Sequence, residues 1–183
     1  MKEIFTVGHS TRKAEEFAEL LKEYGIEQIA DIRTIPKSAY NPQFNSHFLE
    51  KSLESLGIRY AHLEKLGGLR HAGKDSENLG WKNKSFRGFA DYMQTPEFED
   101  GINELLKISK GLKTAIMCAE AVPWRCHRSL VADALLSRGI KIIHILGKGS
   151  SKEHEMTPFA KAGSKGRITY PEEDSAHPAG KEL

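Results

Sequence analysis

Short apolar runs alternate with helix-like stretches along most of this chain, and this alternation limits its possible folds more than any other feature. Phe17, Leu20, Leu21 and Tyr24 recur with the spacing of one helix face, and similar stripes follow later in the chain. Short strands that are apolar on both faces are typical of a parallel sheet covered by helices. The predicted strands span residues 4–7, 26–32, 58–63, 114–117 and 140–146.

The number of predicted strands favours one architecture. Five strands are too few for an eight-stranded barrel, so the pattern predicts an α/β fold. We expect a single three-layer domain over residues 1–148, with an open, mainly parallel five-stranded sheet flanked by helices. After Gly147 the sequence becomes rich in glycine, serine, lysine and glutamate. Residues 149–183 are therefore predicted to be a weakly ordered C-terminal extension, in which residues 167–170 can form one edge strand.

Composition narrows the class of protein but names no substrate. The 183 residues, 39% of them apolar, are enough to bury a core without disulfides. A net charge of +2 gives a weak overall field, so any nucleic-acid role needs a local basic patch. With no apolar run of membrane-spanning length, no signal peptide and two cysteines, we expect a cytoplasmic protein without a membrane partner. The oligomeric state stays open.

Polar and reactive side chains follow the predicted strands where each strand ends. The carboxyl ends of parallel strands lie at one edge of the sheet, and ligands bind in the crevice at that edge. We therefore expect these side chains to converge on one crevice. They are His9, Asp31, Arg33, Glu120, Cys126 and Arg128.

Several of these residues stand in short motifs whose order along the chain resembles a known family. The resemblance is to the prokaryotic family called domain of unknown function 488, and it runs from about Phe5 to Ile145. It implies an α/β domain and assigns no reaction, so the chemistry has to be inferred from the residues. The motifs are Gly8-His9-Ser10, Asp31-Ile32-Arg33, Leu66-Gly67-Gly68, Cys118-Ala119-Glu120 and Cys126-His127-Arg128.

The predicted site divides into catalytic and binding residues. His9 titrates near neutral pH, and we expect it to move protons together with Glu120. Cys126 stands at the start of a predicted helix among cations, so we expect it to be a nucleophile or positioner and more reactive than Cys118. Substrate binding is assigned to Ser10, Asp31, Arg33, His127 and Arg128, with the two arginines holding an anionic group.

These residues predict an enzyme, a hydrolase or transferase, acting on a phosphate-bearing or otherwise anionic substrate, with a nucleotide or nucleic acid as plausible examples. One alternative is a nucleic-acid-binding module without catalysis, because residues 65–87 carry six Lys or Arg against two acidic residues, with Trp81 and Phe86 among them. Another is a cysteine-based metal or redox site. No metal ligands are assigned, because no familiar zinc spacing fits and His127 directly follows Cys126. No cofactor is predicted, and binding of a metal ion stays open.

Overall fold

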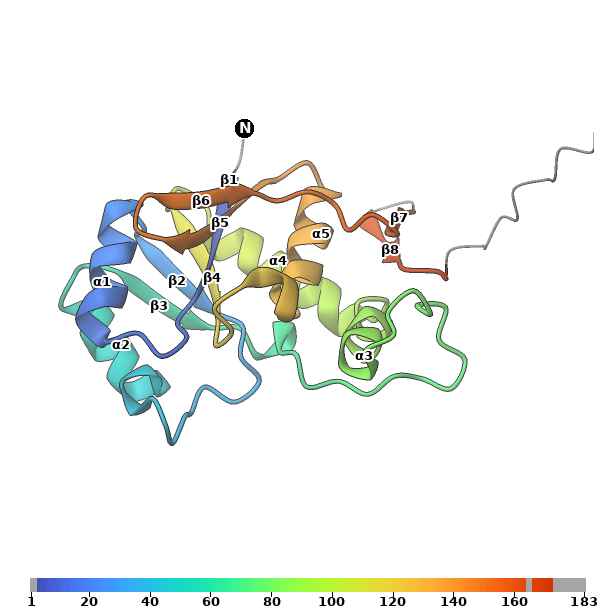
Figure 1. Ribbon diagram of the computed structural model, residues 1–183. Helices are drawn as coiled ribbons and strands as arrows, with labels where there is room; N and C mark the ends of the chain where they lie inside the picture. Colours follow the sequence, from blue (N-terminus) through green and yellow to red (C-terminus); the bar gives the residue numbers. More distant parts are fainter. Residues whose placement is uncertain (1–2, 164–165, 173–183) are drawn as a thin grey trace, which may run out of the picture.

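A central sheet of six strands organises the described part of the chain, residues 3–163 and 166–172, in the computed structural model (Figure 1). The strand order is β3-β2-β4-β1-β5-β6. The first five of these strands in sequence order run parallel, and β6 pairs antiparallel with β5. The strands are β1 (Glu3–Gly8), β2 (Gln28–Asp31), β3 (Arg59–His62), β4 (Thr114–Cys118), β5 (Lys141–Gly147) and β6 (Ser150–Glu153).

Helices cover both faces of the sheet and make it the middle of three layers, which confirms the predicted α/β class (Figure 1). On one face, Val7 of β1 packs in a core with α1 and α2; on the other, Ile4 packs with α4 and α5. None of the described helices is long and apolar enough to cross a membrane. The helices are α1 (Ala14–Glu23), α2 (Ser46–Glu54), α3 (Lys84–Tyr92), α4 (Pro96–Ile108) and α5 (Arg128–Leu136), with 3-10 turns η1 (Pro42–Phe44), η2 (Glu64–Leu66) and η3 (Pro123–Arg125).

The sheet has one strand more than the five that the sequence predicts. The additional strand, β6, is exposed along its whole length and has no apolar alternation, so its pairing with β5 leaves no hydrophobic pattern in the sequence. It begins after Gly149, whose φ of +61° suits a tight turn. β6 lies within the predicted extension. Residues 167–170 add no strand to the central sheet: β8 (Ile168–Thr169) pairs instead with β7 (Lys161–Ala162) in a separate two-stranded sheet. The domain boundary at residue 148 stays a prediction.

A buried polar network ties this C-terminal segment to the sheet. Asp133 of α5 accepts a hydrogen bond from His154 Nε2 at 2.8 Å and another from the Tyr170 hydroxyl at 2.8 Å. Because His154 Nε2 donates, its Nδ1 accepts from His144 Nε2, 2.9 Å away. His144 Nδ1 then accepts from the Thr6 hydroxyl at 2.7 Å. In this arrangement the His144 ring, which accepts at one nitrogen and donates at the other, is neutral.

The surroundings of His144 disfavour its protonated form. Burial lowers the pKa of His144 to about 3, assisted by His154, Arg128 and Lys152 and opposed by Asp133. In an unfolded chain the pKa of the same ring is near 6.5. The unfolded chain therefore binds this proton at a higher pH than the folded protein does.

Because of His144, we expect the free energy of unfolding to decrease as the pH is lowered below about 6.5. The contribution of its neutral ring is fully present above the unfolded pKa of 6.5 and is lost as the pH falls towards about 3. Within this window, one such group changes the free energy of unfolding by about 1.4 kcal/mol per pH unit. Urea unfolding of wild type and His144→Gln at about pH 7.5 and about pH 5 measures it. The variant should show the weaker pH dependence, whereas exposed His71→Gln should match wild type; equal slopes in all three would contradict the assignment.

Candidate functional site

A cavity of about 750 Å³ lies at the carboxyl edge of the parallel strands. Its lining comes from the segments that follow β1, β2 and β4 and from the segment that precedes α5. We call this cavity the crevice. Two predicted site residues, Asp31 and Arg128, do not line it, and both are fully buried. The predicted residues that do line it are His9, Ser10, Arg33, Glu120, Cys126 and His127, and Cys118 lies among them.

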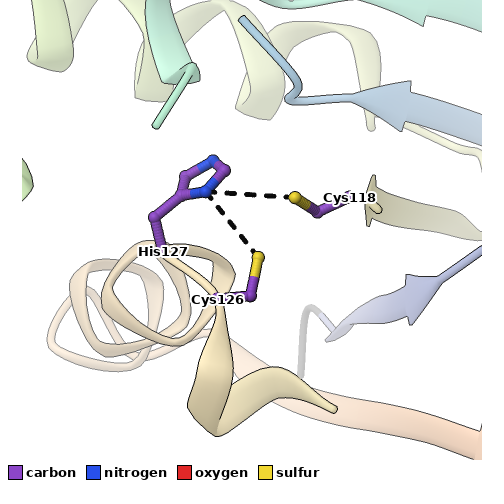
Figure 2. Close-up of side chains that lie close together, drawn as sticks. All are labelled: Cys118, Cys126 and His127. Atoms are coloured by element: carbon purple, nitrogen blue, oxygen red, sulfur yellow. Dashed lines mark hydrogen bonds between the residues drawn. The ribbon is translucent and has the colours of Figure 1, made fainter. Parts of the chain in front are cut away.

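Two thiols and an imidazole form a cluster in the crevice (Figure 2). Cys118 ends β4, and Cys126 and His127 immediately precede α5. His127 Nδ1 lies 3.9 Å from Cys118 Sγ and 3.7 Å from Cys126 Sγ. These three ligand atoms all lie within 4.8 Å of one another. Cys118, predicted from the sequence to be the less reactive thiol, is part of this cluster.

The backbone explains how the adjacent residues Cys126 and His127 both reach the cluster. Cys126 is extended, with φ −137° and ψ 144°, whereas His127 is helical, with φ −54° and ψ −16°. The chain turns between them, so their side chains do not diverge as they do along a strand. Gly68 makes room for the ring, because a Cβ at this position would lie 2.4 Å from His127 Nδ1. In the sequence, only the Gly67-Gly68 pair after the third predicted strand indicates that another group packs closely against the backbone here.

The contact between the two thiols shifts their pKa values in opposite directions, and their relative reactivity stays a prediction. A hydrogen bond from Cys126 holds the pKa of Cys118 well below its usual range, and His127 and Arg128 act in the same direction against the effect of burial. The pKa of Cys126 is raised, first by its bond to Cys118 and then by burial. Cys126 does lie at a helix start, where its Sγ accepts from Arg128 N at 3.4 Å. Its contact with Cys118 outweighs that position.

Arg33 and Asp31 form a buried ion pair. The Arg33 Nε lies 2.9 Å from Asp31 Oδ1, and its Nη2 lies 2.5 Å from Oδ2. Nη2 also donates to the Phe44 carbonyl at 2.8 Å, and Nη1 donates to His9 Nε2 at 3.2 Å. His9 donates through Nδ1 to the Ser10 carbonyl at 2.8 Å, and burial lowers its pKa, with Arg33 adding to this. Four of the five N–H donors of Arg33 and both nitrogens of His9 are therefore engaged among the described residues.

Arg128 holds the loop between β4 and α5 from inside the protein. Its Nη1 donates to the carbonyls of Val7 at 2.8 Å and Glu120 at 3.2 Å, and its Nη2 donates to that of Ala121 at 3.4 Å. Within residues 3–163 and 166–172 it pairs with no carboxylate. Contact between substrate and Arg33 or Arg128 stays a prediction.

Other charged side chains line the crevice with their ends exposed. Lys37, Arg125 and Glu120 all line it, and none of the three has an ion-pair partner among the described residues. With Arg33 neutralised by Asp31, these side chains leave the crevice with a net positive charge. Binding of an anion in the crevice stays a prediction.

The basic loop of residues 65–87 uses most of its cations within the protein. Lys65 pairs with Asp100 at 3.2 Å, and Lys82 pairs with Glu172. Arg70 lies over the Tyr92 ring, and Arg87 donates to the Trp81 carbonyl at 3.0 Å. Trp81 stacks on Phe86 with ring centroids 4.8 Å apart, and Phe86 lines the crevice. The loop thus forms part of the crevice wall, and its contact with nucleic acid stays a prediction.

Comparison with known proteins identifies a family for the chain and no individual relative. Residues 13–135 match the family model described as Domain of unknown function DUF488, which confirms the resemblance seen in the sequence. No curated protein and no solved structure gives a significant match. The matched region ends within α5 and contains the thiol–imidazole cluster.

Proposed function

The chain belongs to the DUF488 family, whose description assigns no reaction, and from the crevice we propose that it is an enzyme acting on a small phosphate-bearing or otherwise anionic substrate. The observation that carries this proposal is the gathering of Cys118, Cys126 and His127 in a crevice that Lys37 and Arg125 also line. Reactive groups of this kind next to uncompensated cations suit transfer or hydrolysis of an anionic group. A cavity of about 750 Å³ accommodates a ligand of nucleotide size.

The free cations make anion binding the best-supported part of the proposal. Lys37 and Arg125 have donors that no group among the described residues uses, so in this proposal they take the anion-holding role predicted for Arg33 and Arg128. A guanidinium can hold two oxygens of a phosphate or carboxylate at once. We therefore assign Arg125 to the anionic group of the substrate, with Lys37 as a second positive charge.

Proton transfer falls to Glu120 in this proposal. Its carboxylate is exposed, lines the crevice and has no partner among the described residues. Its backbone is fixed by Arg128, which holds the Glu120 carbonyl at 3.2 Å. A carboxylate so placed can take a proton from water or from a substrate hydroxyl. His9, whose ring nitrogens are both engaged, would then position Arg33 rather than move protons.

We expect hydrolysis of a panel of phosphate mono- and diesters, inhibited by inorganic phosphate. Arg125→Gln should raise the phosphate inhibition constant about tenfold, because it removes a charged hydrogen-bond donor. Glu120→Gln should lower kcat at least about 100-fold with an unchanged inhibition constant, because it removes a proton acceptor and leaves the anion site intact. Lys51→Gln, on the exposed side of α2, is the matched control and should behave as wild type. Phosphate inhibition that is equal in Arg125→Gln and wild type would contradict the anion site.

A further inference from the structure

The thiol–imidazole cluster has the dimensions of a zinc site. In tetrahedral zinc sites the Zn–S distance is about 2.3 Å and the Zn–N distance about 2.0–2.1 Å, which places the ligand atoms about 3.5–3.8 Å apart. His127 Nδ1 lies 3.7 Å and 3.9 Å from the two sulfurs. The two nitrogen–sulfur distances therefore fit a bound ion to within a few tenths of an ångström, and the two sulfurs lie within 4.8 Å of each other.

The imidazole is already oriented for metal binding. His127 Nε2 lies 3.1 Å from the Ile32 carbonyl oxygen, which can only accept, so Nε2 carries the proton. The lone pair is then on Nδ1, the nitrogen that faces both sulfurs (Figure 2). In metal-bound histidines the N–H of the other ring nitrogen usually donates a hydrogen bond to a backbone carbonyl or a carboxylate in this way. This bond to Ile32 is an observation independent of the spacing of the three ligand atoms.

The surroundings of the sulfurs also fit bound thiolates. Arg128 N donates to Cys126 Sγ at 3.4 Å, a bond that orients the sulfur. The Arg128 side chain adds a positive charge, without a carboxylate partner among the described residues. Two thiolates would balance the charge of one divalent ion and leave a neutral site beside this guanidinium. Sulfur and imidazole ligands select zinc over magnesium or calcium, which prefer oxygen.

We propose that Cys118, Cys126 and His127 bind one zinc ion, with the fourth coordination position open to the crevice. The described residues offer three ligands, and all three line the crevice. Three protein ligands and one open position are typical of catalytic zinc sites, where water or substrate occupies the fourth place. Zinc binding itself stands on the cluster geometry. Only the role of the open position, which would take a water or an anionic substrate oxygen beside Arg125, rests on the proposed function.

The first experiment measures zinc affinity and stoichiometry, with no need for activity. Reduced, metal-free full-length protein is titrated with Zn²⁺ in competition with a chromophoric chelator. We expect one ion per chain in wild type and at least about 100-fold weaker binding in Cys118→Ser and Cys126→Ser. His127→Gln should lose zinc equally, although its amide can still donate to Ile32. Exposed His71→Gln is the matched control and should bind as wild type does.

A second variant separates loss of the site from loss of the fold. Gly68→Ala keeps both thiols and the imidazole, but its methyl group would lie 2.4 Å from His127 Nδ1 and displace the ring. We expect about 10–100-fold weaker zinc binding with an unchanged far-ultraviolet circular dichroism spectrum. Co²⁺ bound to wild type should show thiolate-to-cobalt charge transfer and the intense visible bands of tetrahedral cobalt, and Gly68→Ala should weaken both.

Three outcomes would overturn the proposal. They are wild type that binds no zinc under reducing conditions, zinc binding that is the same in Cys118→Ser, and a cobalt spectrum without thiolate charge transfer. Phosphate inhibition, or phosphate binding to the metal-free protein, is measured separately. Zinc binding without any effect of phosphate would support the metal site and contradict the proposed function. Phosphate binding without zinc binding would contradict the metal site and support the proposed function.

Discussion

We expect Asp133→Ala to lower the free energy of unfolding by about 3–5 kcal/mol, because it leaves several buried donors without an acceptor. Asp133 Oδ1 accepts from His154 Nε2 at 2.8 Å and from Thr157 N at 3.0 Å. Its Oδ2 accepts from the hydroxyls of Thr157 at 2.7 Å and Tyr170 at 2.8 Å. Asp133 and Tyr170 are fully buried, so water cannot replace the lost acceptor without opening the structure.

Urea unfolding of Asp133→Ala at neutral pH, followed by tryptophan fluorescence, measures this effect. Asp100→Ala removes an exposed carboxylate that pairs with Lys65 on the surface, and it should cost no more than about 1 kcal/mol. Tyr170→Phe removes only one of the donors to Asp133 and should cost about 1 kcal/mol. Equal effects of Asp133→Ala and Asp100→Ala would show that the network does not stabilise the protein.

The same network connects the C-terminal segment to the wall of the crevice. Tyr170 packs against Trp81 with ring centroids 5.5 Å apart, and Trp81 stacks on Phe86. Phe86 lines the crevice. A displacement of Tyr170 therefore affects the crevice wall through the Tyr170–Trp81 and Trp81–Phe86 ring contacts. Asp133 itself does not line the crevice. The segment after β6 is in this sense a support for the site.

Strands that are buried leave a hydrophobic pattern in the sequence and can be predicted from it. Strands that are exposed leave no such pattern and are missed. β1, β2, β4 and β5 lie in largely apolar runs because helices cover both faces of the sheet there. The edge strand β3 is only partly buried, and the buried residues Ile58 and Leu63 that flank it carry its sequence pattern. β6 lies at an open edge, so backbone pairing alone defines it and its Ser-Ser-Lys-Glu sequence reads as a loop. The His144 network is equally hidden, since a single histidine in an apolar strand does not indicate its partners on α5 and after β6.

The positions of the strand ends predict where the crevice lies, but they do not predict which partners each side chain there contacts. The rule that ligands bind at the carboxyl edge correctly brings His9, Glu120 and Cys126 to one crevice. Residue type alone cannot tell that Arg33 pairs with Asp31 rather than holding a ligand, because the two side chains lie next to each other in either case. The convergence of adjacent Cys126 and His127 depends on one change of backbone angle, which spacing rules for zinc motifs do not contain.

Gly8→Ala should destabilise the fold by about 4 kcal/mol or more, since the new methyl group would collide with the backbone of the loop after β4. A Cβ at Gly8 would lie 1.8 Å from the Glu120 carbonyl oxygen and 3.0 Å from that of Ala121. These backbone atoms cannot rotate away as a side chain can. They are also acceptors of the buried Arg128 guanidinium, so moving the loop removes two of its hydrogen bonds and leaves the Val7 carbonyl as its remaining acceptor among the described residues.

The matched control for Gly8→Ala is Gly147→Ala. Gly147 also ends a parallel strand, but a Cβ there would meet no atom within 4 Å, and its φ lies outside the left-handed region. Its substitution should change the free energy of unfolding by less than about 1 kcal/mol. Thermal and urea unfolding of both variants compare them directly. If Gly8→Ala were as stable as Gly147→Ala, the loop would have to move without cost, and the close packing that fixes Glu120 beside the crevice would not exist.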